Sequence, residues 1–357
     1  MIETLIVFLK IVFALIWFLT LTLYLTWVER KESAVIQDRI GANRASILGL
    51  RIIGLFQPFA DAIKMIFKED FTPSFSRRFL HNLAPFLSFF FVAITISAMP
   101  FGDFIHIGSR TIRLQILDFN VGLLFVLAML SLGIYGIIIS GWSSNNRFTL
   151  IGSLRGAAQL ISYEVALGLS LIGLIMVYPS LKLSQIVLYQ GDLLLGVIPK
   201  WGILLQPLGF VIFLFAALAE TKRVPFDLPE GESEIIGFFT EYSGLKWGLF
   251  MMTDFMEIII VSCLITTLFF GGWQVPWLAA DGFHLPGGAQ WLLPHWTVVI
   301  LQVAAFNIKV FFFCWLQVLI RWTYPRFRYD QLMDMGWKLL IPLSLVNIIG
   351  TGFVLSL

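Results

Sequence analysis

Cysteine, histidine and charged residues are all scarce in this sequence of 357 residues. Its two cysteines, Cys263 and Cys314, lie far apart with no CxxC companion, which excludes a cysteine-ligated iron–sulfur cluster or zinc site within this chain. The four histidines fall at no ligand-like spacing, and the sequence has neither a P-loop nor a GxGxxG motif after a strand. We predict no metal site, and any redox chemistry must come from a partner.

Charged residues make up 13% of the chain and hydrophobic residues 58%, a balance that excludes an ordinary soluble domain. Apolar runs of about 17–25 residues are long enough to cross a bilayer as helices, and these runs lack the alternation of barrel strands. We predict an all-α, polytopic membrane protein with a single membrane domain over residues 1–357 and eight transmembrane helices. Their expected ranges are 5–28, 83–99, 119–140, 157–177, 201–219, 249–270, 298–316 and 339–357.

The distribution of basic residues predicts the orientation of the bundle. The loops after the odd-numbered helices carry 18 Lys or Arg, and the loops after the even-numbered helices carry four. Because basic loops stay on the side where synthesis occurs, we expect both termini on the non-cytoplasmic side. The loops expected in the cytoplasm are 29–82, 141–156, 220–248 and 317–338.

The first cytoplasmic loop contains an amphipathic segment. From Pro58 onward, apolar residues recur on one helical face and polar residues on the other. The apolar face comprises Phe59, Ile63, Ile66 and Phe67, and the polar face comprises Asp61, Lys64 and Lys68. This pattern predicts an interfacial helix on the membrane surface. It serves either as an anchor or as the side of a lateral doorway for a lipid-soluble substrate.

Several ionisable residues fall inside the predicted membrane helices. Glu29 closes the first helix, and Glu164 is expected about two turns into the fourth. Asp254 and Glu257 open the sixth helix three residues apart, so they share a face, and Lys309 lies near the middle of the seventh. A charge left at the bilayer centre costs at least ~2.5 kcal/mol. These residues are therefore either buried ion pairs that orient helices or members of a proton relay.

A loop between the fifth and sixth helices gathers acidic residues. Six of the 22 acids fall within 22 residues: Glu220, Asp227, Glu230, Glu232, Glu234 and Glu241. Two prolines prevent a regular helix before the EGESE stretch. The loop is either a solvated or docking patch, or a cluster whose proton affinity depends on nearby charge.

Four stretches, in order, resemble the H-subunit family of proton-pumping NADH:quinone oxidoreductase, respiratory complex I. They are QPFADAIK (57–64), RGAAQLISYE (155–164), ETKRVPFDLPEGESE (220–234) and RWTYPRFRYDQLMDMGWK (321–338). In that family this membrane protein lies where the redox arm meets the membrane arm. It forms much of the tunnel for ubiquinone or menaquinone and begins the polar axis that leads to the pumping subunits.

The resemblance implies three sets of site residues, which we carry forward as expectations. The quinone tunnel is assigned Arg30, Arg39, Asp61, Lys64, Arg223, Phe226, Asp227 and Glu230. The proton relay is assigned Glu29, Glu164, Glu220, Glu232, Glu234, Asp254, Glu257 and Lys309. Docking of other subunits is assigned Arg321, Arg326 and Arg328, for which ordinary positive-inside anchoring is the alternative. The family often has Glu where this chain has the shorter Asp254, and Glu257, one turn on, is expected to share that role.

The resemblance also implies the surroundings of the chain. Quinone is the expected substrate, whereas NADH, FMN and the iron–sulfur clusters belong to partner subunits. The expected partners are the redox-arm subunits, small membrane subunits and antiporter-like subunits, with no nucleic acid. The expected location is a bacterial inner membrane. The alternatives are a homologous subunit of a membrane-bound hydrogenase or ferredoxin-linked dehydrogenase, a passive scaffold, and an independent transporter.

Overall fold

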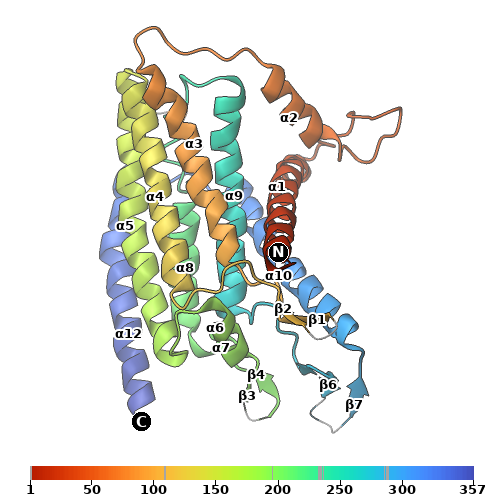
Figure 1. Cartoon of the computed structure of the whole chain (residues 1–357). Coiled ribbons are helices and arrows are strands. Elements are labelled where there is room, and N and C mark those ends of the chain that lie inside the picture. Colours follow the sequence, from red (N-terminus) through yellow and green to blue (C-terminus); the bar gives the residue numbers. More distant parts are fainter. Residues whose placement is uncertain are drawn as a thin grey trace.

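The computed structural model describes residues 2–107, 110–194, 196–231, 235, 237–284, 286 and 289–357, and most of its regular structure is helical (Figure 1). Within these residues, seven helical segments are long and apolar enough to cross a membrane. They are α1 (Ile2–Ile36), α3 (Arg78–Thr95) with the 3-10 turn η1 (Ile96–Ala98), α4 (Gly122–Ser143), α5 (Arg147–Val177), α9 (Gly244–Phe269), α10 (His295–Thr323), and the continuous run of α11 (Tyr329–Asp334), the π-helical turn η2 (Met335–Leu340) and α12 (Ile341–Ser356). The chain is thus a polytopic membrane protein, as predicted.

Shorter elements connect or complete these helices. The remaining helices are α2 (Gln57–Phe67), α6 (Leu183–Gln190), α7 (Gly202–Leu205) and α8 (Pro207–Glu220). Short antiparallel strands, which the hydropathy pattern does not predict, lie at one end of the bundle (Figure 1). They are β1 (Phe104–Ile107) with β2 (Arg110–Arg113), β3 (Leu193–Leu194) with β4 (Ile198–Pro199), and the sheet of β5 (Leu278–Ala279), β6 (Gly282–His284) and β7 (Gln290–Leu292).

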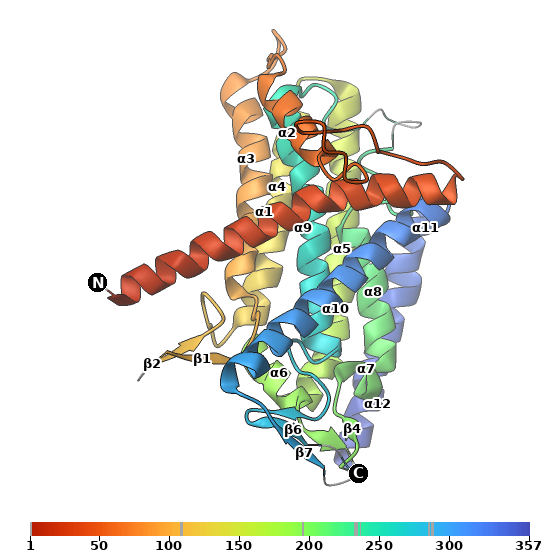
Figure 2. The ribbon, with the colours of Figure 1, turned by 90° about the vertical axis from the view of Figure 1, so that its right-hand side faces the viewer.

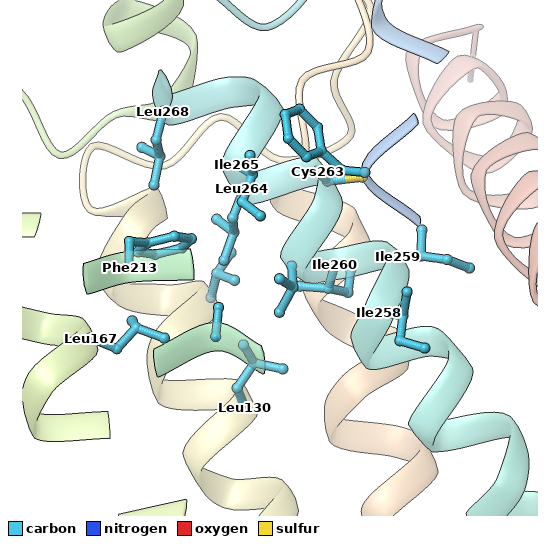
Figure 3. Close-up of a cluster of buried hydrophobic side chains, with 14 of the residues drawn as sticks. Leu130, Leu167, Phe213, Ile258, Ile259, Ile260, Cys263, Leu264, Ile265 and Leu268 are labelled. Atoms are coloured by element: carbon cyan, nitrogen blue, oxygen red, sulfur yellow. The ribbon is translucent and has the colours of Figure 1, made fainter. Parts of the chain in front are cut away.

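Helix α9 forms the centre of the bundle. Every residue from Thr253 to Phe269 is buried, which is expected of a helix that is apolar on all sides. Its residues pack against Phe213 of α8, Leu130 of α4 and Leu167 of α5 (Figure 3). Polar groups on α9 are therefore held away from both lipid and water.

Helices α1 and α10 lie obliquely on one side of this bundle. They come together near α11 and separate toward their N-terminal ends (Figure 2). The N-terminal half of α1 is largely exposed on its outer side, where Phe8, Phe13 and Ile16 are each about 60% exposed. In a membrane these side chains face lipid or another subunit.

Several helices extend beyond their apolar runs, and three of these extensions change where site residues lie. Helix α5 begins at Arg147, where the Asn146 side chain accepts a hydrogen bond from the Phe148 amide (3.0 Å), ten residues before the expected start. Glu164 therefore lies in about the fifth turn of this helix, and the expectation of about two turns was wrong. Helix α9 likewise begins at Gly244, and α1 continues to Ile36, so Asp254 and Glu29 lie inside helices rather than at their ends.

The amphipathic helix expected after Gln57 is present as α2. Pro58 occupies its first turn and is buried, while the apolar residues Phe59, Ile63, Ile66 and Phe67 are exposed. Such an exposed apolar stripe is typical of a helix that lies against a bilayer. Figure 1 shows α2 outside the main bundle, and it contacts α1 through Tyr24 and Arg30.

Candidate functional site

An apolar cavity of about 390 Å³ lies between α1, α2 and α9. Its walls carry aliphatic residues and methionines from all three helices: Leu19 and Leu23 from α1, Ala62, Met65 and Ile66 from α2, and Met251, Met252 and Phe255 from α9. Glu29, Arg30 and Asp61 line the same cavity and are its charged residues. A lipid-soluble molecule with a polar head matches this combination of lining groups.

A second, polar cavity of about 370 Å³ adjoins the first. The two share Arg30, Asp61, Met65 and Trp247, and the polar cavity adds Lys64, Lys68, Tyr242 and Ser243. Arg30 Nη2 lies 2.6 Å from Asp61 Oδ2, so an ion pair joins α1 to α2 where the cavities meet. The quinone-tunnel expectation placed Arg30, Asp61 and Lys64 together, and the structure does bring these three residues to one cavity.

Glu29, beside the apolar cavity, binds two arginines from distant parts of the chain. Arg223 Nη1 donates to Glu29 Oε2 at 2.9 Å, and Arg321 of α10 forms an ion pair with the other carboxylate oxygen. The Arg223 guanidinium also lies 4.1 Å from the centroid of the Phe255 ring. These contacts lead from the cavity wall into the segment that follows α8.

Lys222 is the centre of the buried charges. Its Nζ donates to Glu257 Oε1 at 2.8 Å and lies 3.2 Å from Asp254 Oδ1, and the three side chains are 3%, 10% and 4% exposed. Burial alone would lower the pKa of Lys222, but the carboxylates of Glu257 and Asp254 raise it above its ordinary value. Both acids of α9 therefore share one ammonium group.

Among the described residues Glu220 forms no ion pair, although Lys222 acts on it electrostatically. One of its carboxylate oxygens, Oε2, is buried without a hydrogen-bond partner among the described residues. Glu220 interacts electrostatically with Glu257 on one side and Glu164 on the other. Glu164 in turn accepts a hydrogen bond from Ser131 of α4. Acidic groups thus continue from α9 through the end of α8 into the middle of α5.

The described part of the acidic loop, up to Gly231, faces the same charges rather than open solvent. Arg326 Nη2 donates to Asp227 Oδ2 at 2.7 Å, and Glu230 interacts electrostatically with Asp254. Burial raises the pKa of Asp227 to about 6 against the opposing effect of Arg326. Burial and the neighbouring carboxylates of Asp254 and Asp227 raise the pKa of Glu230 well above its usual range.

We call the connected set the charged chain: Glu29, Glu164, Glu220, Lys222, Arg223, Asp227, Glu230, Asp254, Glu257, Arg321 and Arg326. It contains seven acids and four permanent or near-permanent cations, so it carries more acids than its own bases neutralise. Such a set can bind and release protons when a charge appears nearby.

Other expected site residues lie apart from this set. Arg39 is exposed and donates to Gln37 Oε1 at 2.7 Å, and Arg328 is exposed beside Asp330. Phe226 is buried against Tyr163 and Phe327 and lines neither cavity. The expected positions Glu232 and Glu234 lie outside the described residues.

Lys309 of α10 contacts the chain just beyond the C-terminal end of α9, whereas Asp254 and Glu257 lie near the middle of that helix. Its Nζ donates to the backbone oxygens of Phe270, Gly272 and Gln274 at 2.8, 3.0 and 2.7 Å. These carbonyls follow the last turn of α9, so the ammonium group stabilises a helix C-terminus. The structure does not bring Lys309 to the charged chain.

Sequence reasoning named Lys222 only as a partial counter-charge to the acidic loop, and it missed Gln159. Lys222 follows Glu220 in ETKR, and only its packing against α9 distinguishes it from an ordinary loop lysine. Gln159 Nε2 donates to the backbone oxygens of Ala219 and Phe226, both at 2.7 Å, and so fixes the segment that carries Lys222 and Arg223. In the sequence, the only signal for Gln159 was a polar side chain within an otherwise apolar helical stretch, RGAAQL.

These features define a class: a polytopic helical membrane protein in which a lipid-side cavity leads to a buried chain of ion pairs. Within the described residues, no group of three or more His, Cys, Asp or Glu is placed to hold a metal ion.

The chain belongs to the NADH dehydrogenase family, whose model matches residues 9–352. It is 46% identical to an NADH-quinone oxidoreductase H-subunit of Geobacter sulfurreducens, over 96% of this chain and 94% of that protein. It is 45% identical to an H-subunit of the same enzyme from Geobacter metallireducens, over 96% and 95% of the two chains. It is 42% identical to an H-subunit from Cytophaga hutchinsonii, over 94% and 92%.

Proposed function

We propose that this chain is the H-subunit of an NADH-quinone oxidoreductase, and that it admits quinone from the bilayer and passes the effect of quinone reduction into the membrane. The observation that carries the proposal is the pair of joined cavities between α1, α2 and α9, apolar on one side and polar on the other. The isoprenoid tail fits the apolar cavity, and the head group reaches Arg30, Asp61 and Lys64. NADH, FMN and iron–sulfur clusters belong to partner subunits.

Reduction of the quinone then changes the charge beside the chain. Two electrons from a cluster in a partner subunit and two protons convert quinone to quinol. Until both protons arrive, the reduced quinone carries negative charge, which favours protonation of nearby carboxylates. Glu29 and Arg223 are the first residues of the charged chain to meet this field, followed by Asp254, Lys222 and Glu257. Glu220 and Glu164 carry the response into α5, toward the pumping subunits.

The proposed orientation follows from the loop charges. Helices α7 and α8, separated by the break at Gln206 and Pro207, together form the eighth crossing. With eight crossings, both termini lie on the non-cytoplasmic side of a bacterial inner membrane, and α2 lies on the cytoplasmic surface. Arg328 is exposed on that side, which supports a role in docking the redox arm. Arg321 and Arg326 act inside the charged chain through Glu29 and Asp227.

A pair of variants of α2 tests the route of the quinone. Ala62 lines the apolar cavity, whereas Ala60, two residues away, is exposed and lines neither cavity. Ala62→Trp should lower NADH:quinone turnover of the assembled complex, and its labelling by a photoreactive quinone, about tenfold, a loss of roughly 1.4 kcal/mol. Ala60→Trp should leave both unchanged, and electron transfer from NADH to a water-soluble acceptor should be normal in both variants.

The same experiment separates the rival functions. A passive scaffold predicts no quinone labelling of this chain in the wild-type complex. If Ala62→Trp is labelled and turns over like the wild type, quinone does not pass between α1, α2 and α9. If the purified complex reduces quinone with hydrogen or ferredoxin but not with NADH, the chain serves a different electron donor.

A further inference from the structure

A third cavity, of about 420 Å³, lies between the N-terminal halves of α1 and α10, where the two helices separate (Figure 2). Its lining is almost wholly apolar and includes Phe13 and Ala14 from α1 and Val299 and Val303 from α10. The cavity shares no residue with the two cavities of the proposed function, so either proposal can fail without the other.

Specific contacts form the inner end of this cavity. Trp17 Nε1 donates to Asn307 Oδ1 at 2.7 Å, which ties α1 to α10. The Phe101 ring packs edge-on against Trp17 and Phe306, with ring centroids 5.0 and 5.7 Å apart. The polar atoms at this end therefore have partners, and the space beyond them suits hydrocarbon.

The opposite end of the cavity carries one amine. Lys10 Nζ donates to the backbone oxygen of Gln115 at 3.2 Å, and Lys10 forms no ion pair with an acid among the described residues. Seven residues separate Lys10 from Trp17, which is about 10 Å along a helix. The cavity thus has a cationic end without a counter-ion and an apolar end about 10 Å away.

The rim of the cavity faces outward. Phe13, Trp296 and Ile300 line it and are 64%, 52% and 63% exposed. Tryptophan and lysine together are typical of the membrane–water interface. A ligand that reaches the cavity from the membrane therefore meets an amine at the interface and hydrocarbon beyond it.

We propose that this cavity binds one acyl chain of an anionic phospholipid, whose phosphodiester pairs with Lys10. The bilayer supplies such lipids at high local concentration, and the ammonium group of Lys10 attracts an anionic head group. The charge of Lys10 selects an anionic over a zwitterionic lipid. The bound chain fills the wedge between α1 and α10 and so supports the inclined position of α1.

The test uses the assembled complex in vesicles that contain phosphatidylglycerol or phosphatidylcholine with a photoreactive group in one acyl chain. We expect phosphatidylglycerol to label residues 10–17 and 296–304, with competition by unlabelled phosphatidylglycerol. Lys10→Gln should lower this labelling about tenfold, while Lys200→Gln, which alters an exposed lysine, should not.

A second pair of variants tests whether the acyl chain of the lipid occupies the cavity. Ala304 is exposed and lines the cavity, whereas Ile308, one turn on and 69% exposed, does not. Ala304→Trp should abolish labelling, and Ile308→Trp should leave it unchanged. The proposal is overturned if phosphatidylcholine labels the cavity equally or if Lys10→Gln is labelled fully. It is also overturned if the wild type is not labelled because another subunit covers the wedge.

Discussion

Lys222→Met removes the two central ion pairs of the charged chain and so tests what they contribute. The wild-type ammonium group lies 2.8 Å from Glu257 and 3.2 Å from Asp254, with all three side chains almost fully buried. Removing one partner of a buried ion pair typically costs about 3–5 kcal/mol because it leaves an uncompensated charge. Here two carboxylates lose their partner, and at least one of them must bind a proton instead. We expect NADH:quinone turnover coupled to proton movement to fall about tenfold or more.

The second variant restores the charge balance without restoring the contact. In Lys222→Met/Glu257→Gln the site returns to the net charge of the wild type, since one cation and one anion are both removed, and an amide replaces the carboxylate at nearly the same size. Assembly and thermal stability of the double variant should exceed those of Lys222→Met by about 1–2 kcal/mol, the coupling expected of neighbouring charges. Lys338→Met, which alters a lysine that is 74% exposed, is the matched control.

Assembly is measured by the amount of intact complex, and coupling by proton uptake into vesicles per NADH oxidised. A double variant no more stable than Lys222→Met would show that charge balance does not govern this site. Normal coupling in Lys222→Met would remove Lys222 from the relay altogether.

Three further predictions concern other parts of the charged chain and the docking surface. Glu220→Gln should change stability by less than about 1 kcal/mol, because Glu220 forms no ion pair among the described residues, yet lower proton movement about tenfold; normal pumping in proteoliposomes would contradict this. The pKa of Asp227 is raised from 3.8 to about 6, so the folded state binds more protons and its stability falls as pH rises between those values. Melting temperatures should fall less over this window in Asp227→Asn, and an unchanged slope would exclude Asp227 as the cause. Arg328→Gln breaks only an exposed ion pair with Asp330 and should cost less than about 1 kcal/mol of folding stability, while lowering the retention of the redox arm during purification; full retention would argue against docking there.

Local patterns predicted those parts of the fold that depend on local interactions. The apolar runs predicted the crossings because each run satisfies its own backbone within the membrane. The spacing of Phe59, Ile63 and Ile66 predicted α2 because a helix presents every third or fourth residue on one face. Hydropathy did not predict where helices end, because α5 and α9 continue through polar residues such as Arg147 and Lys246.

The site was only partly predictable. Asp254, Glu257 and Glu164 were candidates because they are titratable residues inside apolar helices. A charge in the membrane costs free energy, so such residues usually have a functional role. The partners were not predictable, because the pairing of Arg223 with Glu29 joins positions 194 residues apart. Lys309 shows the converse: its position in the middle of α10 suggested a relay, but its contacts are three backbone carbonyls beyond α9.

The amino-acid sequence by itself determined that the chain lies in a membrane, which segments are apolar enough to form long helices there, and that more acids than bases gather near one loop. These properties depend on composition and on neighbours along the chain. Only the tertiary structure decided which charges neutralise each other, that Glu220 forms no ion pair among the described residues, and that the apolar and polar cavities adjoin. The physical reason is that electrostatic energy depends on distance and burial, and both are set by how α1, α2, α8, α9 and α10 pack together.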